Sequence, residues 1–154
     1  MYTVFKSGNI KKETELLAGL PHGKEKRYFS TGQLRSVADF EQGLLHGKYL
    51  EYHDNGTLIE DSSWHYGQPH GKHLTWYGNK KEKEDLNYTY SLLDGDASNW
   101  YENGNLKSKG SWKLGFRDGP WKWFDRYGKE IYIEAYKIGA ITYSSRKNET
   151  EFVE

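Results

Sequence analysis

Glycines recur through this 154-residue chain with a period of 24 residues. Fifteen of the 17 glycines keep this spacing, and only Gly78 and Gly110 do not. The periodic glycines form three sets: Gly23, Gly47, Gly71, Gly95 and Gly119; Gly8, Gly32, Gly56, Gly104 and Gly128; and Gly19, Gly43, Gly67, Gly115 and Gly139. A fixed period of this length predicts a repeat protein in which each unit is stabilised by packing on its neighbours.

Each repeat holds two short segments that read as β-strands. In one copy the first segment runs from Lys48 to His53 and the second from Thr57 to Tyr66, with Asp54-Asn55-Gly56 between them. Asn-Gly is a strong hairpin signal because both residues tolerate a positive φ, and frequent glycines disfavour a helix. We therefore predict an all-β fold, a single-layer antiparallel meander of repeated hairpins with a solenoid-like stack. The stretch from Gly67 to Gly71 is expected to be the turn that joins two repeats.

Aromatic residues supply the expected core. Leu, Ile, Val and Phe are scarce, but the chain has 13 Tyr, 6 Trp and 6 Phe, and such rings bury a large area at low entropic cost. Two aromatic positions recur in every full repeat and predict a structural ladder. Its members are Tyr28, Tyr52, Trp76, Trp100 and Phe124, with Phe40, Trp64, Tyr88, Trp112 and Tyr136.

Charge and composition exclude several classes of function. The 22 Lys and Arg equal the 22 Asp and Glu, whereas a nucleic-acid-binding protein needs a basic surplus, so no nucleic-acid partner is expected. The absence of cysteine rules out disulfides and a thiolate nucleophile. No apolar run is long enough to span a membrane and the first residues carry no secretory signal. The expected location is the cytoplasm.

Three turns contain a histidine before a Gly-Lys pair, at His22, His46 and His70. Their spacing does not match a phosphate-binding loop, and no helix follows. Equivalent residues of neighbouring repeats should lie roughly 9.5 Å apart, too far to share one zinc ion. No acid–base pair or nucleophile stands out, so we expect no metal, no cofactor and no enzymatic activity.

The repeat pattern resembles the MORN repeat, in the variant form of small bacterial proteins. The clearest copy runs from Gly95 to Gly119 and includes Trp100-Tyr101-Glu102-Asn103-Gly104 and Gly110-Ser111-Trp112. The resemblance covers about residues 1–142. It implies an interaction protein, either an antitoxin or immunity protein or a scaffold that contacts anionic lipid.

The pattern divides the chain into a repeat array, residues 1–142 with about six repeats, and a C-terminal capping strand or frayed tail, residues 143–154. The third repeat, from Gly78 to Asp94, departs from the pattern because Lys80 and Ser91 replace two periodic glycines. We interpret this region either as a longer solvated hairpin or as a protruding contact loop.

Strand alternation separates two faces. We expect the face of Leu50 and Tyr52 to form the core, and the opposite face, which is aromatic as well, to be either a second core or a partner-binding surface. Trp121 and Trp123 would be its strongest contacts, because Trp is enriched at binding hot spots. The candidate partner-binding residues are Tyr49, His53, His73, Tyr77, Tyr101, Trp121 and Trp123.

These features favour a non-catalytic protein-binding module, most concretely an antitoxin or immunity protein that binds and neutralises a toxin. The alternative is a scaffold that organises partners or contacts anionic membrane lipid. Lys24, Lys48 and Lys72 along one edge give membrane contact only weak support, and acidic residues, Asp94, Asp96 and Asp118, follow along the same edge. Open sheet ends also allow pairing with a second copy of the chain.

Overall fold

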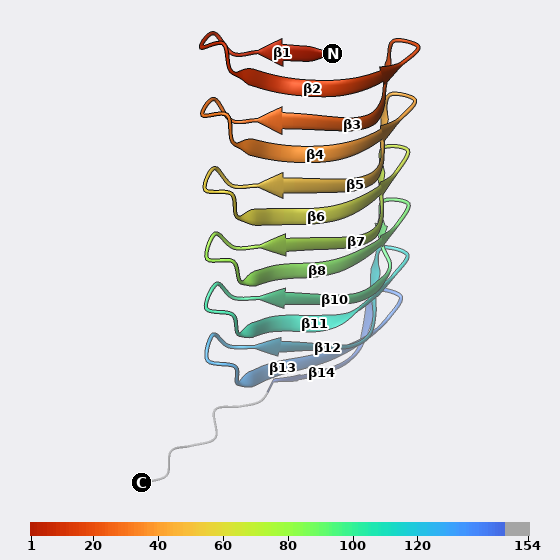
Figure 1. Ribbon diagram of the computed structural model, residues 1–154. Helices are drawn as coiled ribbons and strands as arrows, with labels where there is room; N and C mark the ends of the chain where they lie inside the picture. The colour runs from red at the N-terminus through yellow and green to blue at the C-terminus, as the bar shows by residue number, and fades with distance from the viewer. Residues whose placement is uncertain (147–154) are drawn as a thin grey trace.

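The computed structural model describes residues 1–146, and all of its regular structure is β (Figure 1). The strands pair only in antiparallel fashion and follow one another in chain order across a single open sheet, except that β9 pairs with β8 beside that path. The predicted meander is therefore confirmed. The strands are β1 (Tyr2–Val4), β2 (Ile10–Leu17), β3 (Leu20–Tyr28), β4 (Leu34–Glu41), β5 (Leu44–Tyr52), β6 (Leu58–His65), β7 (Gln68–Trp76), β8 (Glu82–Thr89), β9 (Leu92–Leu93), β10 (Gly95–Trp100), β11 (Leu106–Lys113), β12 (Phe116–Phe124), β13 (Glu130–Lys137) and β14 (Ala140–Arg146).

Two-residue turns join the repeats along one edge of the sheet. In the turn between β4 and β5, Gln42 has a φ of 50° and Gly43 a φ of 85°, the pattern of a type I′ turn. The same positive pair recurs in every turn of this edge. We call this side of the stack the two-residue-turn edge.

Longer turns close each hairpin at the opposite edge. Between β5 and β6, the His53 amide donates to Thr57 O at 2.8 Å and the Gly56 amide donates to His53 O at 2.9 Å. Gly56 has a φ of 82°, as a type I turn followed by a left-handed residue requires. The turn predicted at Asp54-Asn55-Gly56 is confirmed.

The glycine set that begins at Gly23 lies inside strands, and here the prediction was wrong. The connection between β6 and β7 is complete at Tyr66–Gly67, and β7 already begins at Gln68. Gly71 has a φ of 94°, and the register with β6 shifts beside it, between Ser62 and Trp64. A glycine with a positive φ occurs in β-bulges as well as in turns, and the bulge at Gly71 bends strand β7.

The third repeat keeps the shape of the others, so it is neither a longer hairpin nor a protruding loop. Lys80 and Ser91 adopt φ values of 68° and 69°, the left-handed conformation that glycine holds elsewhere. The Lys80 amide donates to Tyr77 O at 2.9 Å, as Gly56 does to His53. Strand β8 has 8 residues, like β6. Lys80 and Ser91 therefore adopt the unfavourable positive φ that glycine has in the other repeats, and the fold does not change.

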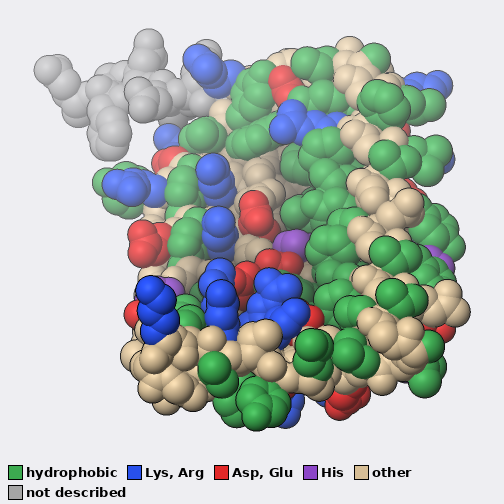
Figure 2. Space-filling view, turned by 90° about the horizontal axis from the view of Figure 1, so that it is seen from above, with side chains coloured by type: hydrophobic (Ala, Val, Ile, Leu, Met, Phe, Trp, Pro, Cys, Tyr) green, Lys and Arg blue, Asp and Glu red, His purple; other side chains and the backbone are tan. Residues whose placement is uncertain are grey.

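The sheet curves around one face, which we call the inner face. Neighbouring strands align its central row, from Thr14, Glu25, Ala38, Tyr49, Ser62 and His73 through Ala97 to Trp121 and Glu134. Apart from Thr57 in a turn, every buried residue of the described chain belongs to this row or to the rows beside it. Seen down the stack, a hollow runs between two walls of side chains (Figure 2).

The core expected on the face of Leu50 is therefore on the opposite side. Leu50 aligns with Asp61, and Leu74 with Asp85, on an outer face where lysine–aspartate pairs form. Alternation shows which residues share a face, but bulges decide toward which face the sheet bends.

The chain's C-terminal part is described as far as Arg146, and β14 pairs with β13. The expected boundary between residues 142 and 143 falls within β14. The rest of the predicted capping segment, residues 147–154, lies outside the described residues.

Candidate protein-binding surfaces

Trp121 lies in the central row of the inner face, toward the C-terminal end of the stack, and is only 2% exposed. Its indole Nε1 donates to Ser111 O at 2.9 Å, and its ring covers the backbone of Gly110. The prediction that Trp121 is a surface contact for a partner was wrong, because the curvature of the sheet encloses this row. Trp121 is instead part of the core, together with Ala97 and Tyr136.

The guanidinium of Arg117 is enclosed by aromatic rings above Trp121. Its Cζ lies 4.9 Å from the centre of the Trp121 ring, and 5.4–5.7 Å from the rings of Trp112, Trp123 and Tyr136. Nη1 also donates to the Tyr136 hydroxyl at 2.9 Å. A cation among desolvated ring faces is strongly held, so this end of the inner face is closed by one of the chain's own cations.

Glu134 completes this cluster. The Tyr132 hydroxyl donates to it at 2.6 Å and the Tyr136 hydroxyl also donates to it. These hydrogen bonds, aided by the positive charge of Arg117, lower the pKa of the Glu134 carboxyl. Burial, followed by the bond to Glu134, raises the pKa of Tyr136. The carboxylate therefore stays ionised and the phenol protonated.

The middle of the inner face holds Tyr49 and His73, two further candidate residues. The Tyr49 hydroxyl donates to Glu51 at 3.1 Å, and burial together with the Glu51 charge raises the pKa of Tyr49 to about 12. The His73 ring lies 5.7 Å from the Tyr88 ring, and its Nδ1 is buried without a hydrogen-bond partner. This part of the face is half-buried and stays accessible from the hollow.

The other candidates divide between the two regions. Trp123 is half-buried on the inner face, 5.9 Å from the Trp121 ring. Tyr77 and Tyr101 lie at the longer turns, where their hydroxyls donate to Trp100 O and Phe124 O of the next repeat. His53 is exposed beside Asp54 in one of these turns. The structure thus brings Tyr49, His73 and Trp123 to one face and leaves the other three at an edge.

The aromatic ladder follows the register of the sheet. Tyr52, Trp76 and Trp100 each occupy the same place, near the end of a strand and beside a longer turn. Phe40, Trp64 and Tyr88 align on the inner face with residues of the neighbouring strands. All of these rings are half-buried, so the stack buries them only in part.

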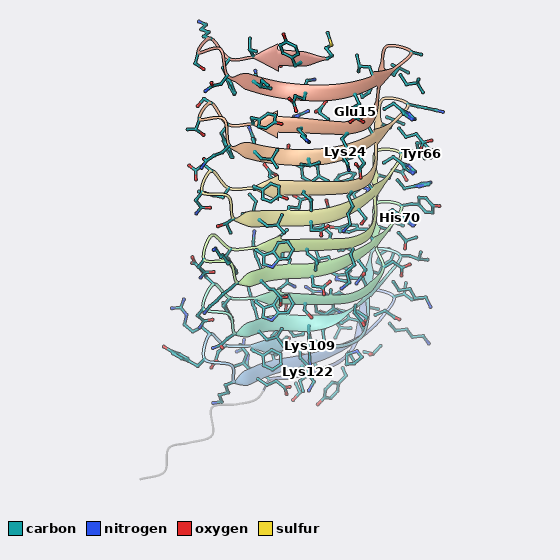
Figure 3. The ribbon with its side chains drawn as sticks, viewed as in Figure 1. Glu15, Lys24, Tyr66, His70, Lys109 and Lys122 are labelled. Carbon is teal, nitrogen blue, oxygen red and sulfur yellow. The ribbon has the colours of Figure 1, made fainter. Side chains whose placement is uncertain are left out.

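The lysines expected along one edge are paired on the outer face. Lys24 contacts Asp39 at 2.8 Å, Lys48 contacts Asp61 at 2.5 Å, and Lys72 contacts Asp85 at 2.7 Å. The sequence prediction of a positively charged edge missed these partners. Further along the sheet, Lys109 and Lys122 lie side by side on neighbouring strands (Figure 3). The three edge lysines are thus neutralised locally.

Exposed apolar side chains line the two-residue-turn edge, and sequence reasoning missed them. They occupy three repeated positions beside the turns, and their exposed fractions range from 41% to 63%. We call this set the apolar stripe: Leu17, Leu20, Leu44, Tyr66, Tyr90, Leu92, Leu114, Phe116 and Ile138. The signal was present in the sequence, because Tyr66, Tyr90, Leu114 and Ile138 stand in turns where polar residues are usual.

The stripe is continuous along the stack. The leucines reach the turn glycine of the next repeat. A Cβ added to that glycine would lie 3.8 Å from Leu20 at Gly43, 3.9 Å from Leu44 at Gly67 and 3.5 Å from Leu92 at Gly115. In its middle, Tyr66 and Tyr90 join three histidines in one chain of ring contacts, in which His46 and Tyr66 are 4.4 Å apart and His70 and Tyr90 4.6 Å. Tyr66 and His70 project outward at this edge (Figure 3).

The three histidines that precede the Gly-Lys pairs, His22, His46 and His70, lie in strands β3, β5 and β7 and not in turns. Within residues 1–146, no group of three His, Cys, Asp or Glu side chains is placed to hold an ion. His46 and His70 instead contact His65, at ring distances of 5.0 and 5.7 Å.

The described part of the chain also lacks any helix long and apolar enough to cross a bilayer.

Comparison with protein families explains the repeat unit. The MORN repeat variant matches residues 21–42, 45–65 and 93–114. No curated protein matches the chain. Two of the matched segments coincide with the hairpins β3–β4 and β5–β6, and the third covers β9 to β11. The hairpins at β7–β8 and β12–β13 have the same turns and register. The chain therefore carries MORN repeats of the variant type.

Proposed function

We propose that this protein is an antitoxin or immunity protein that neutralises a toxin by binding it through the apolar stripe. MORN repeats indicate a non-catalytic binding module. The observation that carries the proposal is the stripe itself, since a continuous row of exposed apolar side chains on a single chain marks an interaction site. Tyr66 and Tyr90 supply the rigid rings that anchor such contacts.

The stripe suits a protein partner better than a lipid surface. Anionic membranes attract unpaired basic side chains, whereas Lys24, Lys48 and Lys72 are each paired with an aspartate. The stripe is also narrow, because it follows one edge of a curved sheet. A toxin bound to the apolar stripe would contact successive repeats along the length of the stack.

A toxicity assay tests the proposal. A toxin encoded beside this gene is expressed in cells with and without the protein, and the two proteins are co-purified. Tyr90→Asn and Leu114→Asn together should abolish protection and co-purification without lowering the Tm, because Asn tolerates the positive φ of both turn positions. Gln42→Asn is the control, since Gln42 occupies the same turn position with a polar side chain.

Two results would reject the proposal. The first is growth arrest by the neighbouring toxin that the intact protein does not relieve. The second is equal protection by the stripe variant and the wild type. Salt-sensitive sedimentation with anionic liposomes, together with no toxin binding, would favour the lipid scaffold instead.

A further inference from the structure

Three glutamates, Glu51, Glu60 and Glu84, lie in one row across the middle of the inner face. Glu51 and Glu60 face each other directly across β5 and β6. Thr75 aligns with Glu60 on one side and with Glu84 on the other. The side chains of Glu51 and Glu60 keep 27% and 22% of their exposure. Like charges on neighbouring strands destabilise a sheet, so this arrangement is costly unless a cation compensates it.

For Glu60 and Glu84, the described residues do not provide that cation. Glu25, nearer the N-terminus on the same face, pairs with Lys12 at 3.5 Å and with Arg27 at 2.8 Å. Glu51 pairs with Arg35 at 3.8 Å. Among the described residues, Glu60 and Glu84 have no lysine or arginine within ion-pair distance.

Two hydroxyl groups and a histidine lie beside Glu60 and Glu84 instead. The Ser62 hydroxyl donates to Glu60 at 2.7 Å and the Thr75 hydroxyl to Glu84 at 3.3 Å. His73 Nε2 lies 3.8 Å from Glu60. Burial and the charges of Glu84 and Glu60 raise the pKa of Tyr88, which agrees with the negative field expected here.

The C-terminal part of the same face shows how it holds a cation. Arg117 lies among Trp112, Trp121, Trp123 and Tyr136, with the ionised Glu134 nearby. The middle of the face offers similar components, namely the carboxylates and the rings of Tyr49, His73 and Tyr88, but no lysine or arginine of the described residues pairs with Glu60 or Glu84. The C-terminal part of the face thus contains its own cation, Arg117, whereas Glu60 and Glu84 in the middle of the face have no lysine or arginine partner among the described residues.

We propose that the middle of the inner face binds an extended segment of a partner protein that carries lysine or arginine side chains, with Glu60 and Glu84 as their counter-ions. The inference depends on the proposed function only in that the ligand is a protein; it concerns a surface other than the apolar stripe. Charge complementarity selects the ligand, since anionic lipid or nucleic acid would be repelled.

The spacing of the carboxylates favours an extended ligand over a single metal ion. Glu60 and Glu84 occupy equivalent positions of successive repeats, two strands or roughly 9.5 Å apart. In a polyproline II segment every third residue recurs after roughly 9.3 Å. Cationic side chains at every third position would therefore meet Glu60 and Glu84 in turn.

A peptide titration tests this inference. The probe is a labelled seven-residue peptide with arginines at positions one, four and seven and prolines between them, followed by fluorescence anisotropy at low ionic strength. Glu60→Gln with Glu84→Gln should weaken binding about tenfold or more. The control, Glu82→Gln with Glu102→Gln, changes the net charge equally at exposed positions and should change the affinity less than twofold.

The inference is overturned if the arginine peptide does not bind, if both double variants lose affinity equally, or if a peptide with glutamine in place of arginine binds as well. Thermal melts show whether the variants fold, and removing two like charges should not lower the Tm. Peptide binding without protection from the toxin would reject the proposed function alone. Protection without peptide binding would reject this inference alone.

Discussion

The contact between Gly110 and Trp121 makes a quantitative prediction about the core. A Cβ on Gly110 would lie 2.3 Å from Cδ2, 2.4 Å from Cε2 and 2.6 Å from Cγ of Trp121. Gly110 does not have a positive φ, so alanine can adopt its backbone and only the clash opposes the substitution. Gly110→Ala must therefore displace the buried indole.

The expected cost follows from what the indole supports. Overpacking a core by one methyl group costs about 1–3 kcal/mol, and for a chain of this size each kcal/mol lowers the Tm by about 2–4 °C. The displaced ring would also leave its bond to Ser111 O and its contact with Arg117. We expect Gly110→Ala to lower the Tm by about 2–12 °C.

A double-mutant cycle separates the clash from other effects. Trp121→Ala alone should cost about 3–5 kcal/mol, but in that background Gly110→Ala has nothing to displace, so the two effects should fall short of additivity by at least about 1 kcal/mol. The assay is thermal and urea unfolding, followed by both circular dichroism and tryptophan fluorescence. Gly78→Ala is the control, because Gly78 also lacks a positive φ and a Cβ added there would have no atom within 4 Å. Equal stability of the two glycine variants, or full additivity in the cycle, would refute the reasoning.

Three further predictions concern strain, charge and pH. Ser91→Gly should raise the stability by about 1 kcal/mol because Ser91 holds a φ of 69°; an unchanged Tm would show that the turn is not strained. Arg117→Lys should lower the Tm and shift the tryptophan emission to the red, because an ammonium cannot stack flat on several rings; an unchanged spectrum would contradict the cage. Burial and the Glu51 charge raise the pKa of Tyr49 to about 12, so the folded state holds this proton more tightly than the unfolded chain, and the stabilisation is present below about pH 10 and lost as the pH rises toward 12. Tyr49→Phe should therefore lose less stability than the wild type between about pH 9.5 and 11.5, and equal losses would contradict the assignment.

The strand meander could be predicted from the sequence because the periodic glycines mark positions where the backbone takes a positive φ. Gly56 and Gly67 were assigned correctly to turns, since a hairpin needs a left-handed residue at these places. Gly71 was misassigned because a bulge inside a strand needs the same conformation. Local conformation can be predicted from such residues, but the register of a bulge depends on the partner strand.

The binding surfaces were harder to predict, for a different reason. Alternation placed Tyr49, His73 and Trp121 on one face correctly, yet it could not show that the sheet bends toward that face and buries Trp121. Lys24 and Asp39 are 15 residues apart, so their pairing follows only from the register. The apolar stripe lies in and beside turns, where the alternation of strand residues gives no prediction of which side chains are exposed.

Comparing equivalent positions of the six repeats distinguishes residues that the fold requires from residues that it does not require. Positions that bend or close the sheet hardly vary from copy to copy, and even Ser91 takes the backbone conformation of the glycine that it replaces. One inner-face position varies widely in size and charge through the six copies: Lys12, Ser36, Glu60, Glu84, Ser108 and Tyr132. The backbone pairing of neighbouring strands is the same whichever of these residues is present. Since the fold tolerates any of them, requirements of folding do not explain two glutamates without a lysine or arginine partner in successive repeats, whereas the binding of a basic segment that we propose would explain them.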